Sequence, residues 1–457
     1  EKVRGQNAYA VGRDMAFAPD DRANFVEFQT RVTASYDAQM KEFGLRPIDA
    51  AKAPAQVHEA VMTQVGQVLG ERSRFKKASK RPERNVFDKD PASDSEAIRR
   101  NYMGEKKGAH FYFRNMLLPM QERFARLMDM AAMPKAFLHG SPHVDNYAKS
   151  AQGAAMIDFD RSRFGPYAWD LARVLVSVSL RRKKGGDDFL ERDAERALLK
   201  GYRRGLRHPD QPFSEMRRLK DVEPEEGERS TADYLAHNGK WARELRENAL
   251  PVDDAQVGGL MASYMASRGE PGLLKEYFVA EAGRGHGSMG LRGIFLVVLR
   301  PRDAASGKDA VLLSFKQTRV DPDTEWYKSP YGSEHERMAA AAELYAPGWE
   351  QRLGGARLAG VEYQARAVPP LNAKLKKMLS PEDQRDLLYA VGTQLGRAHA
   401  LSSKEGAAAI EAHLDEHWGE LLVAGGTIRD EIVDAHERYL KAMKKGGLEP
   451  GDGESED

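Results

Sequence analysis

The spacing of apolar residues predicts helices at both ends of the chain and a strand-rich stretch between them. Residues 20–43 place apolar side chains on one helical face, with Asp20 or Asp21 as the N-cap and Gly44 as the end. The other predicted helices cover residues 116–131, a segment after Pro166, residues 334–345, Pro381 to His399, and one or two helices within 406–445.

Strands are predicted where short apolar runs lie between turn residues. The runs 290–299 and 310–316 are two such strands joined by a hairpin connection, and a third covers residues 361–368. A short strand is expected to end in Met156-Ile-Asp-Phe159, and the aromatic segment 110–115 is also predicted to be a strand. Helices and strands in separate runs indicate an α+β fold.

The composition is that of a soluble globular protein. The 457 residues include 70 Lys and Arg and 69 Asp and Glu. The net charge is therefore too small to attract nucleic acid or a membrane surface over a long range. No apolar run reaches the roughly 18 residues of a transmembrane segment. The lack of cysteine excludes disulfides and thiol catalysis. We expect a cytoplasmic protein, with export as the alternative because the chain starts at Glu1 and has no cysteine.

The most informative polar residues lie in two short segments. His139-Gly-Ser-Pro-His-Val-Asp-Asn146 forms the first, and Ile157-Asp-Phe-Asp160 forms the second. Magnesium prefers hard oxygen ligands. Asn146 from a loop and Asp158 from the end of a strand would supply them, with Asp160 assisting. Phosphoryl transfer needs such a metal site, a grip on the phosphates and a positioned acceptor.

Two other interpretations of these segments stay open. Imidazole and carboxylate groups also suit transition metals, so His139, His143, Asp145 and Asp158 would form the centre of a metal-dependent hydrolase. Alternatively, the two histidines only fix the loop by bonding to backbone groups, and the aspartates are turn or capping residues.

A glycine-rich segment and a lysine further along the chain predict a grip on phosphates. Glycines let backbone amides approach an anion, which points to a loop made of Gly285, Gly287, Ser288 and Gly290. Lys316 interrupts an apolar strand, where a lysine is costly unless it is paired. The candidate partners are glutamates of the next helix: Glu334, Glu336 and Glu343, the last of which is assigned to the cofactor site. The alternative places Lys316 on a solvent-facing edge.

Several blocks of the chain resemble the bacterial domain-of-unknown-function family 2252 over residues 100–400. The blocks are Phe111-Tyr-Phe-Arg114, Gly140-Ser-Pro-His-Val-Asp-Asn-Tyr147, Asp158-Phe-Asp160, Gly165-Pro-Tyr-Ala-Trp-Asp-Leu-Ala-Arg173, Gly285-His-Gly-Ser-Met-Gly-Leu-Arg292, Phe315-Lys-Gln317 and Leu395-Gly-Arg-Ala-His-Ala400. The loop and strand blocks are similar to those of aminoglycoside phosphotransferases and related small-molecule kinases. This similarity implies bound ATP and Mg²⁺ and an acceptor, or a protein partner, that the sequence does not identify.

The order of these parts differs from that of a kinase. In kinases the Gly-rich loop and the lysine precede the catalytic loop, whereas here they follow it. We therefore predict a circularly permuted, two-lobed kinase-like fold, in which Lys316 must lie close to Asp158.

The sequence predicts five regions along the chain. They are a helical extension with a linker (1–100), a catalytic-loop lobe (101–275), a β-rich lobe (276–370), the remaining helices (371–445) and a disordered acidic tail (446–457).

One position departs from the pattern of the resembling family. Ser141 stands where family members carry an aspartate, which in kinases orients the acceptor hydroxyl and takes its proton. The loss of such a base costs about 10²–10⁴ in rate. Asp145 would replace it in a rearranged loop that His143 shapes. The sequence thus predicts an active transferase with a displaced base, a nucleotide transferase of different chemistry, or a pseudokinase.

Overall fold

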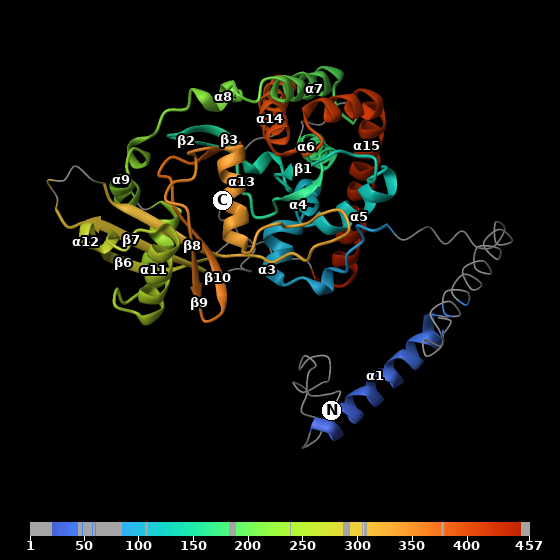
Figure 1. Cartoon of the computed structure of the whole chain (residues 1–457), viewed down its shortest axis with the longest axis horizontal. Helices are drawn as coiled ribbons and strands as arrows, with labels where there is room; N and C mark the ends of the chain where they lie inside the picture. The colour runs from blue at the N-terminus through green and yellow to red at the C-terminus, as the bar shows by residue number, and fades with distance from the viewer. Residues whose placement is uncertain are drawn as a thin grey trace. The chain divides into compact units, whose positions relative to one another are not determined.

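The computed structural model describes most of the chain, in two units. The described residues are 21–43, 48, 57, 60, 85–105, 108–181, 189–237, 239–286, 293–303, 305, 309–375 and 379–448. One unit spans Glu1–Glu83 and the other Arg84–Asp457. The first unit contains α1 (Asp21–Phe43), which confirms the predicted N-terminal helix. The second contains the other elements (Figure 1).

The largest sheet has six antiparallel strands in the order β5-β6-β7-β8-β10-β9. The strands are β5 (Ala249–Leu250), β6 (Tyr277–His286), β7 (Gly293–Pro301), β8 (Val311–Gln317), β9 (Gly354–Leu358) and β10 (Val361–Ala367). The strands predicted over 290–299, 310–316 and 361–368 are confirmed as β7, β8 and β10.

Alternation of side chains along β7 and β8 gives each face of this sheet its own apolar layer. Phe295 and Phe315 pack with α11 (Ala255–Arg268) on one face. Leu296 and Leu312 pack on the other face with α9 (Thr231–Ala236) and α10 (Lys240–Glu247). Lys316 shares the face of Leu312, because strand residues an even number apart point to the same side.

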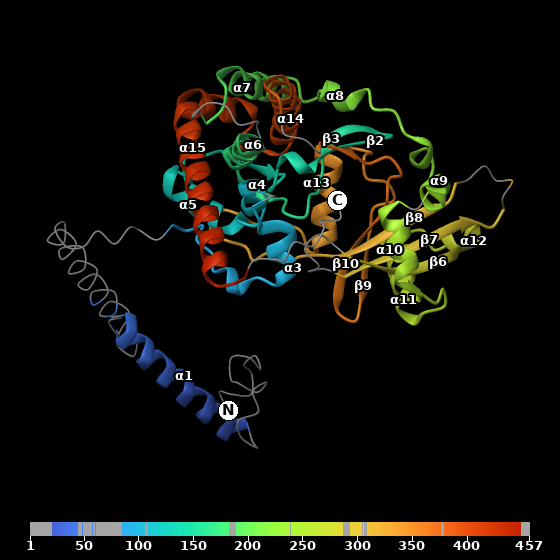
Figure 2. The ribbon, with the colours of Figure 1, turned by 180° about the vertical axis from the view of Figure 1, so that it is seen from behind.

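Helices and two small sheets make up the rest of the second unit (Figures 1 and 2). Strand β1 (Lys135–Leu138) pairs with β4 (Arg163–Pro166), and β2 (Tyr147–Ser150) pairs with both β3 (Gly153–Met156) and β11 (Ala373–Lys374). The longer helices are α5 (Leu117–Leu127), α6 (Ala168–Arg181), α7 (Arg192–Arg207), α13 (Glu334–Tyr345), α14 (Pro381–Ser402) and α15 (Ala407–Lys445). The fold is α+β, as predicted. No helix among the described residues is long and apolar enough to span a bilayer.

The strand predicted over residues 110–115 is wrong. This segment belongs to the helix α4 (Gly108–Arg114). Its aromatic side chains suggested a strand, but Tyr112 and Phe113 are fully buried in the main core, and the Tyr112 hydroxyl donates to Phe87 O at 2.6 Å. Tertiary packing therefore overrides the intrinsic preference of aromatic residues for strands.

Helices α7 and α14 meet at their backbones because glycines line the contact. A Cβ on Gly201 would lie 2.3 Å from Tyr389 O, and one on Gly396 would lie 2.2 Å from Tyr202 O. These distances exclude a larger residue unless the helices move apart. The contact fixes α14, which places His399 beside Asp170 of α6.

Candidate functional site

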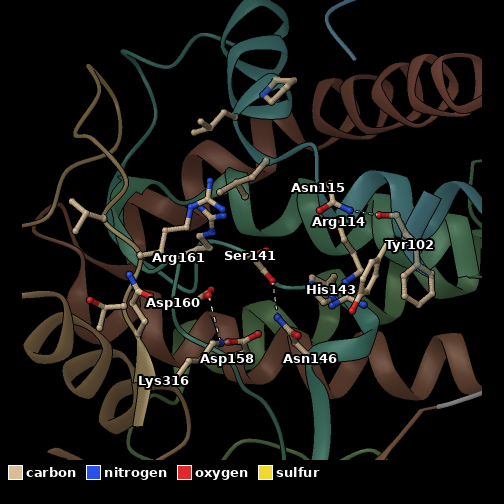
Figure 3. A pocket seen from close by; sticks show the side chains of 18 residues that line it. Tyr102, Arg114, Asn115, Ser141, His143, Asn146, Asp158, Asp160, Arg161 and Lys316 are labelled. Carbon is tan, nitrogen blue, oxygen red and sulfur yellow. Dashed lines mark hydrogen bonds and ion pairs between the residues drawn. The ribbon is translucent and has the colours of Figure 1, made fainter. Parts of the chain in front are cut away.

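A cavity of about 530 Å³ joins the end of β8 to the two polar segments predicted from the sequence (Figure 3). Its lining includes six of the predicted site residues: Ser141, His143, Asn146, Asp158, Asp160 and Lys316. The structure therefore brings together the predicted metal ligands, the lysine and two residues of the loop. The other wall comes from α4 and α5, including Phe111, Arg114 and Leu118, and from the segment after β8.

The β2–β3 hairpin places Asn146 beside Asp158. Tyr147 pairs with Met156 at the open end of this hairpin, and Ile157 N donates to Asn146 O at 2.8 Å. Asp158 then takes the left-handed backbone conformation, with φ of 74°. Aspartate adopts this conformation more readily than most non-glycine residues. The chain leaves the hairpin at this turn, and the Asp158 side chain lines the cavity.

Lys316 reaches this turn from the six-stranded sheet. Its Nζ lies 3.7 Å from Asp158 Oδ1 and 3.8 Å from Asp160 Oδ2. The proximity that the permuted order requires is therefore met. The alternative that leaves Lys316 on a solvent-facing edge is wrong, because the side chain is 31% exposed and faces two carboxylates.

Among the described residues, none of the three glutamates proposed as partners of Lys316 pairs with it; its ion pairs are with Asp158 and Asp160. Glu343 is exposed on α13, and among the described residues its carboxylate forms no ion pair with Lys316. Glu350, in the loop after α13, is instead buried with a side-chain exposure of 3% and paired with Arg366. Burial raises the pKa of Glu350, while the charges of Arg366 and Lys316 act to lower it. Glu350 is thus the buried carboxylate whose electrostatics involve Lys316.

Only one residue of the predicted glycine loop falls within the described chain. Gly285 lies in β6 opposite Ile294, and a Cβ there would meet Trp241 and Glu244 of α10 at 3.1 Å. Close packing between sheet and helix therefore accounts for this glycine. Gly287, Ser288 and Gly290 lie outside the described residues.

A buried aspartate fixes the start of the loop. Asp170, fully buried on α6, accepts hydrogen bonds from His139 N at 2.7 Å and Gly140 N at 3.0 Å. His399 Nε2 lies 3.2 Å from the same carboxylate. Gly140 has φ of 84°, and a Cβ there would lie 1.8 Å from Arg161 O. Contacts with α6 and α14 therefore fix the backbone conformation at the start of the loop.

Asp145 is held in an ion-pair network outside the cavity lining. Its carboxylate accepts from Arg114 at 3.0 Å and from Arg181 at 2.7 Å, and His110 Nδ1 lies 3.6 Å away. Burial acts to raise the Asp145 pKa, but the neighbouring charges hold it below its ordinary value. His110 is buried, which lowers its pKa to about 3, so the two arginines carry the charge near neutral pH. This geometry disfavours Asp145 as a replacement base.

Ser141 contacts a buried arginine instead of a histidine or carboxylate. Arg173 is fully buried on α6, and its Nε donates to Ser141 Oγ at 3.4 Å. Burial, reinforced by Arg161 and Arg114, lowers the Arg173 pKa to about 9, which leaves the guanidinium charged at neutral pH. Asn146 Nδ2 donates to the Ser141 carbonyl at 3.3 Å. Nothing in this arrangement activates Ser141 as a nucleophile or base.

The metal-hydrolase hypothesis does not fit the described residues. His139 is fully buried between the rings of Phe159 and Tyr345, and burial lowers its pKa and that of His143. Within the described ranges, no group of three or more histidine, aspartate or glutamate side chains is placed to hold a metal ion. The predicted centre of His139, His143, Asp145 and Asp158 is therefore not formed in the described structure.

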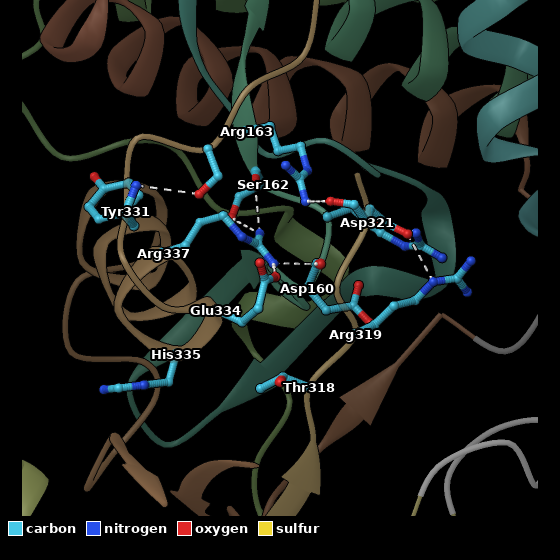
Figure 4. A network of polar contacts seen from close by, with 12 residues as sticks. Asp160, Ser162, Arg163, Thr318, Arg319, Asp321, Tyr331, Glu334, His335 and Arg337 are labelled. Carbon is cyan, nitrogen blue, oxygen red and sulfur yellow. Dashed lines mark hydrogen bonds and ion pairs between the residues drawn. The ribbon is translucent and has the colours of Figure 1, made fainter. Parts of the chain in front are cut away.

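An arginine on α13 holds the segment that carries Asp158 and Asp160 (Figure 4). Arg337 Nη1 donates to Ser162 O at 2.6 Å and to Phe159 O at 3.3 Å, and its Nη2 donates to Asp160 O at 3.0 Å. Glu334 pairs with the same guanidinium. The side chain of Arg337 is 1% exposed, so these contacts are shielded from water and fix the position of the segment.

Sequence reasoning missed Arg173, Arg337 and Glu350. Arg173 carries a usable signal, since it is a lone charge in the apolar run of α6, as Lys316 is in β8. Arg337 and Glu350 carry no such signal, because they lie among other polar residues in the sequence. Their contacts form only when α13 and the loop after it pack in the folded unit.

Part of the chain matches a known family. Residues 40–210 match the model of the phosphotransferase enzyme family. The matched range contains the loop at 139–146, Asp158 and Asp160, and it ends before Lys316. No curated protein and no solved structure matches the chain significantly. The match supports a kinase-like phosphotransferase at a coarse level, a class that generally uses ATP and Mg²⁺.

Proposed function

We propose that the cavity binds ATP with Mg²⁺ and that the protein is a kinase-like phosphotransferase acting on a small molecule or a protein. The observation that carries this proposal is the position of Lys316, 3.7 Å from Asp158 and 3.8 Å from Asp160. A lysine between two carboxylates at a cavity is suited to a ligand that brings both metal and phosphate.

The donor set fits magnesium. Mg²⁺ is usually held by one or two carboxylates together with substrate phosphates and water. Asn146 and Asp158 would hold it, with Asp160 assisting, and all three line the cavity. When bound, Mg²⁺ would neutralise part of the charge on the phosphates. Lys316 would bind a phosphate oxygen, and Arg337 and Asp170 keep the ligand-bearing segments in place.

The permuted order is part of the proposal. The family match covers residues 40–210, which contain the loop at 139–146, and it ends before the sheet that carries Lys316. The ends of the second unit also lie side by side, since Arg438 pairs with Asp88 and Tyr439 donates to Asp94 at 2.8 Å. Adjacent ends are the condition under which permutation is tolerated.

A pseudokinase is the second candidate, and Ser141 favours it. No carboxylate replaces the missing base, because Asp145 is occupied by Arg114 and Arg181. We expect slow ATP hydrolysis that increases in Ser141→Asp, on the order of 10² or more, since a positioned base contributes that much. An unchanged rate in a folded, nucleotide-binding variant would favour the pseudokinase.

Thermal unfolding with ATP and Mg²⁺ tests the binding proposal. A nucleotide at about 100 times its Kd adds roughly 2.7 kcal/mol to the free energy of unfolding. Asp158→Asn should abolish this gain, and asparagine tolerates the left-handed backbone, so the unliganded fold should persist. Asp253→Asn, at an exposed position far along the chain, serves as the control. No stabilisation of the wild type at millimolar nucleotide would refute the proposal.

A further inference from the structure

The end of the cavity beside Ser141 differs in charge from the end that carries the carboxylates. Figure 3 places Ser141 between Arg161 and Arg114, which both line the cavity. Arg319 also lines the cavity and is joined to Arg161 through Asp321. Among the described lining residues, the acidic side chains are Asp158 and Asp160, both beside Lys316. The cavity is therefore divided into a metal-binding end and a cationic end.

The arginines around this end outnumber the carboxylates that neutralise them. Asp321 accepts hydrogen bonds from both Arg161 and Arg319, so two guanidinium groups share one carboxylate. Arg114 and Arg181 share Asp145 in the same way. Each of these two clusters keeps one positive charge in excess.

Arg173 adds a buried positive charge behind Ser141. Among the described residues it forms no ion pair within 4 Å; the Asp170 carboxylate favours its charge from a longer distance, and the ring centroids of Phe113 and Trp169 lie 4.2 and 5.9 Å from its guanidinium carbon. Its hydrogen-bond partners are Ser141 Oγ at 3.4 Å, Met120 Sδ at 3.3 Å and Arg114 O at 3.5 Å. A buried charge that no carboxylate contacts directly is costly, and an anion in the adjacent cavity would lower that cost.

Ser141 presents a hydrogen-bond donor to the cavity. Its Oγ accepts from Arg173, and a guanidinium has no acceptor atom. The hydroxyl proton must therefore be donated elsewhere, and the described residues offer it no acceptor. A serine whose oxygen already accepts from a guanidinium is a poor base, and its remaining hydroxyl proton suits an anionic oxygen.

We propose that this end is the acceptor subsite and that the acceptor is a small molecule bearing an anionic group, a phosphate or a carboxylate. The anionic group would meet the Ser141 hydroxyl and the guanidinium groups of Arg161 and Arg319. Leu118 and Val320, which are 45% and 75% exposed, line the same cavity and offer apolar contact to a carbon skeleton. A polycation such as an aminoglycoside would be repelled. This inference rests on the proposed function, which supplies the nucleotide at the other end.

Isothermal titration tests the subsite in the full-length protein. The protein is saturated with Mg²⁺ and a non-hydrolysable ATP analogue, and inorganic phosphate, glycerol 3-phosphate, acetate, glycerol and kanamycin are titrated separately. We expect binding of at least one anion and none of glycerol or kanamycin. Preference among the anions distinguishes a phosphate from a carboxylate acceptor.

Two variants and one control link the binding to the proposed residues. Arg319→Gln and Ser141→Ala should each weaken anion binding about tenfold, the size expected for one charge-assisted hydrogen bond. Arg319 is 44% exposed, so this variant should fold. Arg357→Gln, on β9 with 71% exposure, should leave the affinity unchanged.

Three results would overturn the proposal: no anion binding at 10 mM, binding that both variants leave unchanged, or binding that the nucleotide analogue abolishes. The last result would place the anion in the nucleotide site. Failure of the nucleotide itself to bind would refute the proposed function separately, and anion titration of the free protein would then still decide whether the cationic end binds anions.

Discussion

At the residue scale, the loop depends on histidines that the fold keeps neutral. Burial lowers the pKa of His110 to about 3, and burial also lowers the pKa of His139 and His143. In the unfolded chain a histidine titrates near 6.5. Below that pH the unfolded state binds protons that the folded state does not, so acid shifts the equilibrium towards unfolding.

We therefore predict that the free energy of unfolding falls as the pH is lowered from 7 to 5. His110 alone contributes about 1.4 kcal/mol for each pH unit below 6.5. In His110→Gln the loss between pH 7 and 5 should be smaller by about 2 kcal/mol, as measured by urea unfolding at each pH. The exposed His208→Gln is the control. Equal losses in both variants would contradict the assignment of His110 as a buried neutral group.

Individual site residues were predictable where local structure alone brings them together. Asn146 and Asp158 are joined by a short hairpin, so their spacing in the sequence was sufficient. Lys316 was marked by its charge in an apolar strand. The choice of Glu343 failed because the sequence does not reveal which side of α13 faces the sheet, and the buried glutamate lies in the following loop as Glu350.

At the element scale, α13 links the sheet to the segment that carries Asp158 and Asp160. Arg337 from this helix donates hydrogen bonds to three backbone carbonyls of residues 159–162. Arg161 pairs with Asp321 just after β8, and Phe164 exchanges two hydrogen bonds of 2.9 Å with Lys328. The strand that carries Lys316 and the turn that carries Asp158 are thus held by contacts on both sides.

We predict that Arg337→Met destabilises the protein by about 3–5 kcal/mol, because the change leaves buried carbonyls and Glu334 without their partner. Urea unfolding measures the loss. Nucleotide affinity, measured separately, should also fall, since Asp160 loses its anchor. Arg300→Met, at a half-exposed position on β7, should cost less than about 1 kcal/mol. A similarly small cost for Arg337→Met would show that α13 does not hold the segment.

Elements were predictable where the apolar period was unambiguous. Strands β7, β8 and β10 and helices α13, α14 and α15 follow the expected ranges. The segment of α4 was predicted to be a strand because its aromatic residues fit either structure. Its packing against α6 and α15 determines the helical conformation. The small strands β9 and β11 carry too few residues for a periodic signal.

At the scale of the whole molecule, the central claim is that two distant parts of the chain form one nucleotide site. The order of motifs suggested this arrangement, and Lys316 lies beside Asp158 as it requires. The sequence could not reveal the network of arginines around Ser141, because it is assembled from α4, α6 and the segment after β8. The chemistry of the acceptor therefore had to be inferred from the structure.

Labelling with an acyl-phosphate derivative of ATP tests the central claim most directly. Such a reagent acylates lysines beside the bound phosphates, and mass spectrometry identifies the modified residue. The proposed site predicts Mg²⁺-dependent acylation of Lys316 that excess ATP prevents and that Asp158→Asn greatly reduces. Labelling of other lysines with Lys316 unmodified, or labelling of Lys316 that ATP does not compete, would contradict it.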